Sequence, residues 1–353
     1  MIGKTLIAGF IGTMLLAAVP GMAEKAPVIP GSKETFPVSP SPWEDRLLLY
    51  SLKQEVEGET AIHVPGPLVS LSKNGDAWRV REIRSLMADM DTGSVVWAKG
   101  SAYVTSAKGI FRLRTQGLPQ KIYAGKPTGL AVSGDGATLA FWLSSGKRDV
   151  LVAIRVSDGR VLRRWSRPFN LRTETSGWEL VFTPDGRSIL ARTYDEEDSV
   201  HLKAFDLHTA SMTSLLEDCY SLVQSGDSIF ILSGEGESRS LYRFSGGKLE
   251  LLEHVGDLHS LTPTAHSNQV VLTNAFKQHL LVYDTDKHVM QEVNGCTDAT
   301  VLKSGQQIFF RDGKIYLDPG SCPPVNASTT EDILRYAQGQ ASEYGGKART
   351  TLK

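Results

Sequence analysis

The 353-residue sequence predicts an all-β protein, a single β-propeller of seven blades with six as the alternative count. Three observations lead to this prediction. Short apolar runs alternate with turn residues along most of the chain, two of the turns are near-copies, and the pattern recurs about every 40 residues. One four-stranded sheet of that length cannot bury both of its faces alone. Several sheets stacked in a ring bury those faces and leave few exposed edges.

The first 23 residues have the pattern of a signal peptide. Lys4 precedes an uncharged run from Leu6 to Val19, Pro20 ends the run, and Gly21 and Ala23 are small enough for a cleavage site. The run is shorter than the roughly 20 apolar residues of a membrane-spanning helix, although an uncleaved anchor is the alternative. We therefore expect a mature chain without a membrane span, in the periplasm or, alternatively, secreted.

Residues 24–44 are rich in proline, which favours an extended and weakly structured lead-in. The prolines are Pro27, Pro30, Pro37, Pro40 and Pro42. The alternating pattern then begins, and the propeller is expected over residues 45–320. Because the first and last sheets would otherwise meet without a covalent link, we expect a strand from one terminus to complete the last blade.

Two hairpins show the repeating unit most clearly. Residues 130–141 and 180–191 both read as strand, tight turn and strand, with Gly136 and Gly186 in the turns. Glycine is favoured there because hairpin turns require positive φ angles. Corresponding turns are expected at Gly100, Gly226, Ser267 and Gly305. The interval from Gly136 to Gly186 is longer than the intervals between the other turns, which predicts an insertion near residues 170–177.

Residues 183–191, Thr-Pro-Asp-Gly-Arg-Ser-Ile-Leu-Ala, resemble the Ser-Pro-Asp-Gly hairpins of bacterial WD-repeat-like propellers. That group includes the Tol-system periplasmic propeller and the YVTN-type surface propellers. The likeness is strong here, fair at residues 133–140 and faint elsewhere. The resemblance implies the fold and not a partner, because the α/β domain that precedes the Tol-system propeller has no counterpart in this sequence.

The cysteines are Cys219, Cys296 and Cys322. In an oxidising compartment one pair can form a disulfide and leave one thiol free. Cys296 and Cys322 are closest in sequence and bound one repeat, so we expect the disulfide between them.

Composition and motifs exclude several functions. Lys and Arg total 38 against 39 Asp and Glu, a formal charge of -1, which argues against a nucleic-acid binder. The sequence has no Gly-x-Ser-x-Gly elbow and no phosphate-binding glycine loop in the mature chain, so no catalytic residue and no cofactor are predicted. Residues 156–165 resemble one tryptophan-docking repeat of quinoprotein propellers, but a single copy does not predict a quinone. Asp206 and Asp284 are expected to shape turns.

Metal binding has two candidates. His254, His259 and His266 fall close together in sequence and could hold a divalent ion if their side chains converged, although their spacing does not require it. The acidic run at residues 195–198 could bind calcium, but a solvated loop tip is the expectation there. We therefore predict no metal and keep the three histidines as the candidates to check.

The final segment, residues 321–353, is expected to be a tail with a short amphipathic helix. Ser328 and Glu331 match a capping box, and Ile333, Leu334 and Ala337 recur at helical spacing. This helix either packs on the propeller or docks a cell-envelope protein partner through residues 325–353.

Together these features favour a non-catalytic periplasmic scaffold for protein–protein interaction in a cell-envelope assembly. The alternatives are a periplasmic enzyme of the lyase, lactonase or hydrolase type, with a channel site built from dispersed histidines and acids, and a propeller that binds sugar or peptide in its central channel.

Overall fold

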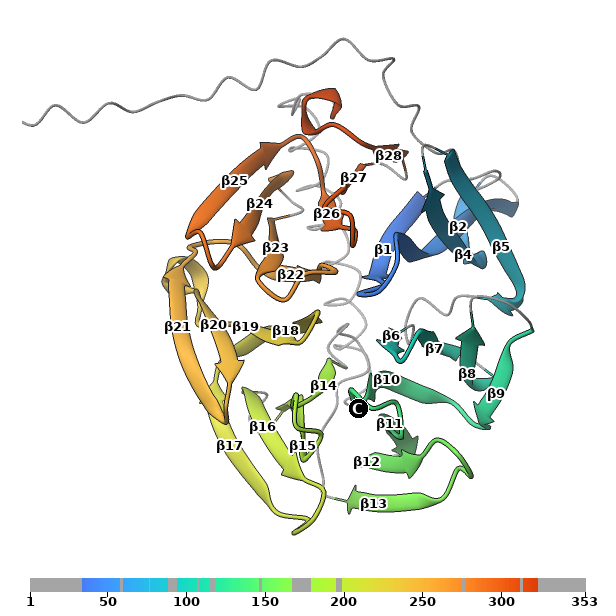
Figure 1. Cartoon of the computed structure of the whole chain (residues 1–353), viewed down its shortest axis with the longest axis vertical. Coiled ribbons are helices and arrows are strands. Elements are labelled where there is room, and N and C mark those ends of the chain that lie inside the picture. Colours follow the sequence, from blue (N-terminus) through green and yellow to red (C-terminus); the bar gives the residue numbers. More distant parts are fainter. Residues whose placement is uncertain are drawn as a thin grey trace, which may run out of the picture.

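The computed structural model describes residues 34–322, except 58–59, 76, 88–93, 107, 115–117, 146–147, 167–178, 195–198, 275–276 and 312–313. Seven antiparallel sheets, named blades 1 to 7 in chain order, surround a central channel (Figure 1). The predicted all-β propeller with seven blades is confirmed, and the six-blade alternative is wrong. The signal peptide, the insertion near residues 170–177, the acidic run and the tail helix lie outside the described residues.

Blades 2 to 6 are four-stranded meanders that run from an innermost to an outermost strand. Their strands are β6 (Val95–Ala98), β7 (Ser101–Ser106), β8 (Gly109–Arg114) and β9 (Gln120–Tyr123) in blade 2; β10 (Pro127–Val132), β11 (Thr138–Ser145), β12 (Arg148–Arg155) and β13 (Val161–Ser166) in blade 3; β14 (Leu180–Phe182), β15 (Ser188–Tyr194), β16 (Val200–Asp206) and β17 (Met212–Glu217) in blade 4; β18 (Cys219–Ser225), β19 (Ser228–Ser233), β20 (Ser240–Ser245) and β21 (Lys248–His254) in blade 5; and β22 (Ser260–Pro263), β23 (Gln269–Asn274), β24 (His279–Asp284) and β25 (Val289–Asn294) in blade 6.

Blades 1 and 7 depart from this plan. Blade 1 contains β1 (Glu34–Pro40), β2 (Arg46–Glu57), β4 (Pro67–Asn74) and β5 (Ala77–Met87), and β3 (Thr60–Pro65) pairs only with β2. Blade 7 contains β26 (Asp298–Val301), β27 (Gln307–Arg311) and β28 (Lys314–Tyr316). The helical elements of the described chain are two short 3-10 turns, η1 (Gly236–Ser238) and η2 (Pro319–Ser321), and no described helix has the length and hydropathy to cross a membrane.

All six turns expected from the repeat join the first and second strands of blades 2 to 7. In the turn of Gly136, Ser133 Oγ donates to Asp135 Oδ1 over 2.5 Å, and the backbone N–H two residues after Asp135 donates to the same oxygen over 2.9 Å. Residues 183–188 repeat both bonds at 2.6 and 3.1 Å. The two hairpins share a mechanism because the polar side chain before the turn and the turn aspartate satisfy the same backbone groups.

Alternate side chains of a strand pack against opposite neighbours, as the two-residue period of a strand requires. Leu139 and Phe141 of β11 pack against blade 2, whereas Ala140 and Trp142 pack against blade 4. Seven hydrophobic clusters result, one at each junction between neighbouring blades. The core of this protein is therefore a ring of interfaces between sheets.

Among the described residues, no strand from the N-terminus is exchanged into the last blade, although the sequence predicted such a strand. The N-terminal strand β1 pairs with β2 in blade 1, and blade 7 has three strands among the described residues. Leu47 and Leu49 of blade 1 instead pack with Ile308 and Phe310 of blade 7 in one buried cluster. These four side chains are almost completely buried. Apolar packing therefore holds the two blades together.

The predicted lead-in over residues 24–44 also needs correction, because residues 34–40 form β1. Pro37 and Pro40 lack a backbone N–H and are therefore compatible with an edge strand. β1 pairs on one side only, with β2, and its register shifts between Pro37 and Ser39. Its second edge faces the central channel (Figure 1), where no described strand pairs with it.

The structure joins Cys296, which precedes β26, to Cys322, which follows η2, in a disulfide. This bond ties the beginning of blade 7 to the last described residue of the chain. The remaining cysteine, Cys219, is a buried free thiol, and burial raises its pKa to about 12. Such a thiol is a poor nucleophile because the reactive thiolate is disfavoured.

A candidate binding site in the central channel

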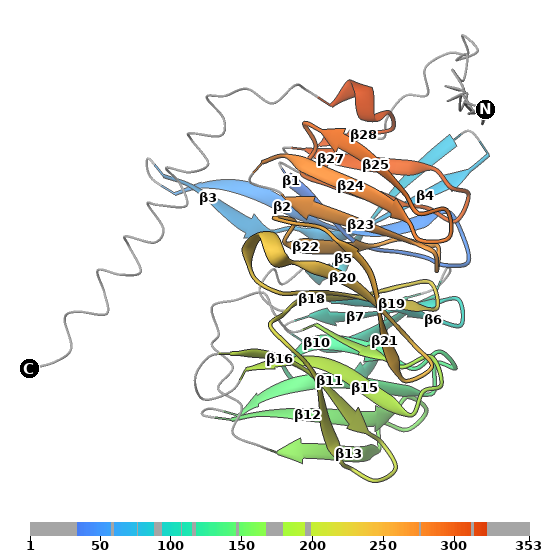
Figure 2. The ribbon, with the colours of Figure 1, turned by 90° about the vertical axis from the view of Figure 1, so that its left-hand side faces the viewer.

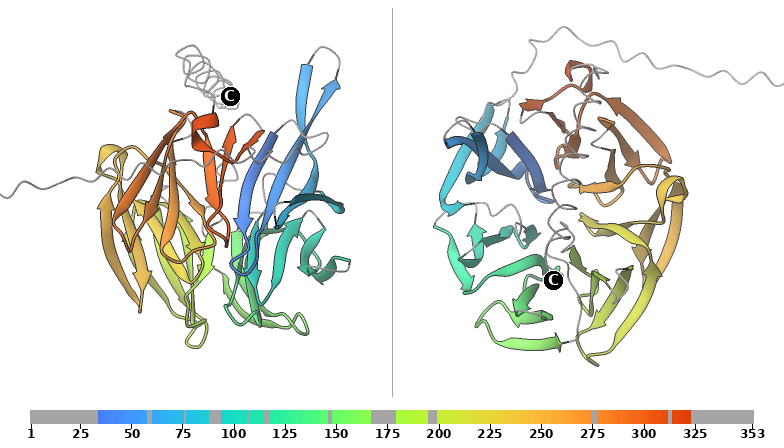
Figure 3. Two further views of the ribbon diagram at one scale, coloured as in Figure 1. Left: turned by 45° about the horizontal axis from the view of Figure 1, so that its top comes forward. Right: turned by 180° about the vertical axis from the view of Figure 1, so that it is seen from behind.

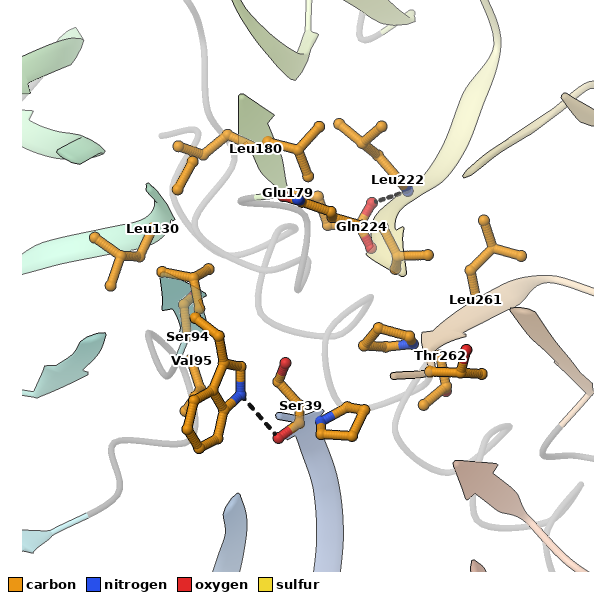
Figure 4. Close-up of a pocket in the computed structure, with 18 of the residues that line it drawn as sticks. Ser39, Ser94, Val95, Leu130, Glu179, Leu180, Leu222, Gln224, Leu261 and Thr262 are labelled. Carbon is orange, nitrogen blue, oxygen red and sulfur yellow. Dashed lines mark hydrogen bonds between the residues drawn. The ribbon is translucent and has the colours of Figure 1, made fainter. Parts of the chain in front are cut away.

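The central channel contains a cavity of about 360 Å³ where innermost strands of the blades meet (Figure 4). Its lining combines apolar residues from several blades, among them Leu130, Leu180 and Leu222, with a comparable share of polar groups. Within the described part of the chain, its lining includes two carboxylates, Glu179 and Asp298, and no Lys, Arg or His. Sequence reasoning singled out neither of these acids.

The two acids occupy equivalent places in their blades. Each innermost strand runs from one face of the ring, here called the upper face, to a lower face where the hairpin to the second strand lies. Glu179 immediately precedes β14 and Asp298 begins β26, so both lie where an innermost strand leaves the upper face. Each also stands seven residues before its turn glycine, Gly186 or Gly305. Superposition of the repeats on these glycines is the signal that could have found the acids.

Glu179 links blade 4 to blade 5. Its Oε2 accepts the backbone N–H of Leu222 over 2.6 Å (Figure 4), and its Oε1 accepts the hydroxyl of Ser221 over 3.1 Å. Arg192 Nη1 lies 3.5 Å from Oε2. Burial raises the pKa of Glu179, and the Arg192 charge and these hydrogen bonds oppose that rise without cancelling it. The carboxylate therefore has a cation and several donors supplied by the protein.

No cation of the described chain pairs with Asp298 in this way. Its Oδ1 accepts the hydroxyl of Thr262 over 2.6 Å and the backbone N–H of Ala299 over 2.7 Å. Its Oδ2 has no hydrogen-bond partner among the residues that the structure describes. Burial raises the pKa of Asp298 to about 7, and the bonds from Thr262 and Ala299 only partly oppose this rise.

A belt of hydrogen bonds connects the two acids with the blades between them. Besides its bond to Glu179, Ser221 Oγ accepts the N–H of Leu261 in blade 6 over 3.4 Å. Thr262, the next residue of β22, reaches Asp298 in blade 7. Four consecutive blades thus hold the acids in place, which allows Asp298 to accept a hydrogen bond from a ligand without rearrangement.

The three histidine candidates do not form a site. His259 precedes β22 and His266 follows it, so the two lie at opposite faces, and His254 ends the outermost strand β21. His254 Nδ1 lies 2.9 Å from Ser240 Oγ, and His266 Nε2 lies 2.8 Å from the Leu302 carbonyl. Burial and the nearby Arg239 lower the pKa of His259. Within the described residues, no three His, Cys, Asp or Glu side chains are arranged to hold a metal ion.

The interpretation of the turn aspartates is confirmed. Asp206 Oδ1 accepts the backbone N–H groups of His208 and Thr209 over 2.8 and 2.6 Å. Asp284 Oδ1 likewise accepts the N–H groups of the second and third residues after it, over 3.2 and 3.1 Å. Both carboxylates are engaged by local backbone, and backbone donors hold the pKa of Asp206 below its usual range.

No family model and no curated protein sequence matches the chain. Solved structures with a similar fold include hydrazine synthase of Kuenenia stuttgartiensis, at 12% identity and a TM-score of 0.53 over 86% of this chain and 99% of that one. An acylaminoacyl peptidase of Pyrococcus horikoshii matches at 11% identity and a TM-score of 0.56, over 84% of this chain and 52% of that one. TolB of Acinetobacter baumannii matches at 13% identity and a TM-score of 0.43, over 75% and 73%. Likeness at these identities shows the propeller fold alone.

Proposed function

We propose that this protein is an exported, non-catalytic β-propeller that serves as a protein-interaction scaffold in the cell envelope. The observation that carries the proposal is a two-stranded ribbon, residues 53–57 of β2 together with β3, that stands out from blade 1. Among the sheets of the described chain, blade 1 alone has a strand outside its main path. The ribbon is visible as the blue pair that projects from the ring (Figure 3).

The pairing pattern places this ribbon beyond the sheet. β2 pairs with β1 over residues 47–52 and with β4 over residues 46–49, whereas residues 53–57 pair only with β3. Because β2 is a second strand, it runs toward the upper face, where the acids of the channel lie. Viewed from the side, β3 extends past the neighbouring strands (Figure 2).

A ribbon of this kind is suited to recognition of an extended peptide segment. β3 pairs only with β2, so its second edge presents N–H and C=O groups without a strand partner in the described chain. An added strand from another protein would satisfy those groups through main-chain hydrogen bonds. We therefore assign the ribbon to docking of an extended segment of a partner protein.

Two features support a location outside the cytosol. Residues 1–23 have the signal-peptide pattern. The Cys296–Cys322 disulfide is of the kind that persists in oxidising compartments such as the periplasm. In this proposal the residues 325–353 provide a second contact to the partner.

The experiment removes the ribbon without disturbing the ring. Leu52 and Pro65 pair directly across β2 and β3, so an Asn-Gly turn in place of residues 53–64 closes the hairpin. The tagged full chain, this variant and a variant that lacks residues 325–353 are used to capture proteins from envelope extracts. We expect a reproducible partner with the full chain, its loss with the ribbon variant and its weakening without the tail. Recovery of the same partner by a ribbon variant with unchanged melting temperature would contradict the proposal.

A second candidate function is binding of a small ligand in the channel. It is favoured by the cavity of about 360 Å³, since ligand sites are concave and carry a small number of placed polar groups, here the carboxylates of Glu179 and Asp298.

A further inference from the structure

We propose that the central channel binds a primary ammonium group on an aliphatic chain, with Asp298 as its counter-ion. This inference rests on the cavity and is independent of the docking ribbon. The ammonium group belongs either to a free alkylamine or to the lysine side chain of a peptide, and the two share one chemistry.

The charge of the cavity selects a cation. Among the residues that the structure describes, the lining contains the carboxylates Glu179 and Asp298 and no basic side chain. Arg192 lies 3.5 Å from Glu179 and offsets that charge, whereas no ion pair is found for Asp298 among the described residues. A carboxylate in a partly desolvated channel attracts a cation more strongly than one in water does, because the local dielectric is lower.

The hydrogen-bonding capacity at Asp298 matches an ammonium group. Oδ1 already accepts two protein donors, from Thr262 and Ala299, while Oδ2 accepts none in the described chain. Ser260 and Thr262 line the same cavity from β22 and carry hydroxyl oxygens. An ammonium group has three N–H donors and no acceptor. It can therefore donate to Oδ2 and to the hydroxyl oxygens, and no acceptor of the ligand then faces an acceptor of the protein.

Part of the wall matches an alkyl chain. Val96, Trp97 and Val223 line the cavity and are only partly buried, so they present apolar surface to it. Burial of methylene groups against such surface favours binding because it removes them from water. A stem of four or five methylenes therefore gains affinity from these side chains while its charged end reaches Asp298.

The test measures binding of n-pentylamine and of 1-pentanol to the full chain by calorimetry at pH 8, where Asp298 is ionised. We expect saturable 1:1 binding of n-pentylamine and at least tenfold weaker binding of 1-pentanol. Asp298→Asn keeps an oxygen for Thr262 and Ala299 but removes the charge, so we expect it to weaken n-pentylamine binding at least tenfold. Glu237→Gln is the matched control, because Glu237 lies in η1 between β19 and β20, at the upper face but outside the cavity.

Equal binding of amine and alcohol by the unaltered chain would overturn the proposal, whatever the stability of the variants. Failure of the unaltered chain to bind n-pentylamine would also overturn it, and so would equal weakening by Glu237→Gln.

A second arm compares acetyl-Gly-Lys-Gly-amide with its norleucine analogue. Binding of the lysine peptide but not of its norleucine analogue identifies a lysine side chain as the ligand. If the protein binds n-pentylamine but not the lysine peptide, the ligand is a free amine. The ribbon variant should bind n-pentylamine normally, which separates this result from that of the scaffold proposal.

Discussion

At the scale of single residues, the two channel acids show how neighbours decide the behaviour of equivalent positions. Glu179 has Arg192 beside it and accepts donors from blade 5. Among the described residues, Asp298 accepts hydrogen bonds from Thr262 and from its own neighbour Ala299, and burial dominates its pKa. The same place in two repeats thus holds a carboxylate that the protein satisfies and one that a ligand can still satisfy.

The raised pKa of Asp298 predicts that stability falls as the pH rises. The pKa is about 7 in the folded protein and 3.8 ordinarily, so between these values the folded state holds a proton that the unfolded state releases. The free energy of unfolding then decreases with pH across this interval, by on the order of 4 kcal/mol in total. We expect Asp298→Asn to remove this decrease and to be more stable than the unaltered chain at pH 8. Urea unfolding at pH 5, 6, 7 and 8 measures both effects.

Glu179 also makes the free energy of unfolding decrease with pH, because its pKa is also raised. It is present in the unaltered chain and in Asp298→Asn alike. The difference between the two unfolding curves therefore isolates Asp298. Parallel curves for the two proteins across the whole pH range would show that Asp298 ionises normally.

At the scale of the elements, the hairpins between first and second strands have the same role but different surroundings. Gly186 has φ +69°, and a methyl group added there meets no atom within 4 Å. Gly226 has φ +53°, and the same methyl would lie 2.4 Å from Ser267 Oγ and 2.8 Å from Ser267 N. Ser267 belongs to the corresponding hairpin of blade 6 and accepts the N–H of Asp227 over 2.9 Å. The Gly226 hairpin therefore touches the next blade, and the Gly186 hairpin has room around its turn.

This difference predicts unequal costs for the same substitution. Gly186→Ala suffers only from the positive φ, and we expect it to lower the free energy of unfolding by about 1 kcal/mol. Gly226→Ala adds a clash with backbone of the next blade, and we expect a loss of about 3 kcal/mol. Urea unfolding of the two variants gives the comparison. Equal losses would mean that blades 5 and 6 do not meet at this turn.

At the scale of the whole molecule, the ring is held by contacts between segments far apart in sequence. Blade 1 meets blade 7 through a buried cluster that includes Leu47 and Phe310, and Ser304 N–H donates to Asp45 Oδ1 over 2.7 Å. The disulfide secures the other end of blade 7. Blade 7 has three strands among the described residues, so these contacts stabilise a sheet that is smaller than its neighbours.

The disulfide is therefore expected to stabilise the ring. Cys296 and Cys322 are 26 residues apart, and closure of such a loop in the unfolded chain corresponds to about 3.5 kcal/mol. We expect the double variant Cys296→Ser/Cys322→Ser to lose about 3 kcal/mol of unfolding free energy, and the unaltered chain to lose the same amount in reductant. Chemical unfolding with and without dithiothreitol measures this. A double variant that reductant destabilises further would show that the effect does not come from this bond.

The sequence by itself determined the repeat, its turns and the propeller fold, because strand alternation and turn chemistry act between residues that are near in the chain, whereas it left six blades open beside seven. Gly136 and Gly186 could be placed for this reason. It did not reveal β1, because the prolines of residues 34–40 argue against a strand unless that strand lies at the edge of a sheet. It also pointed to His259 and His266, which the ring separates onto opposite faces. Only the tertiary structure brought Glu179 and Asp298 to one channel, because closure of the ring, and not spacing along the chain, decides which innermost strands share a cavity.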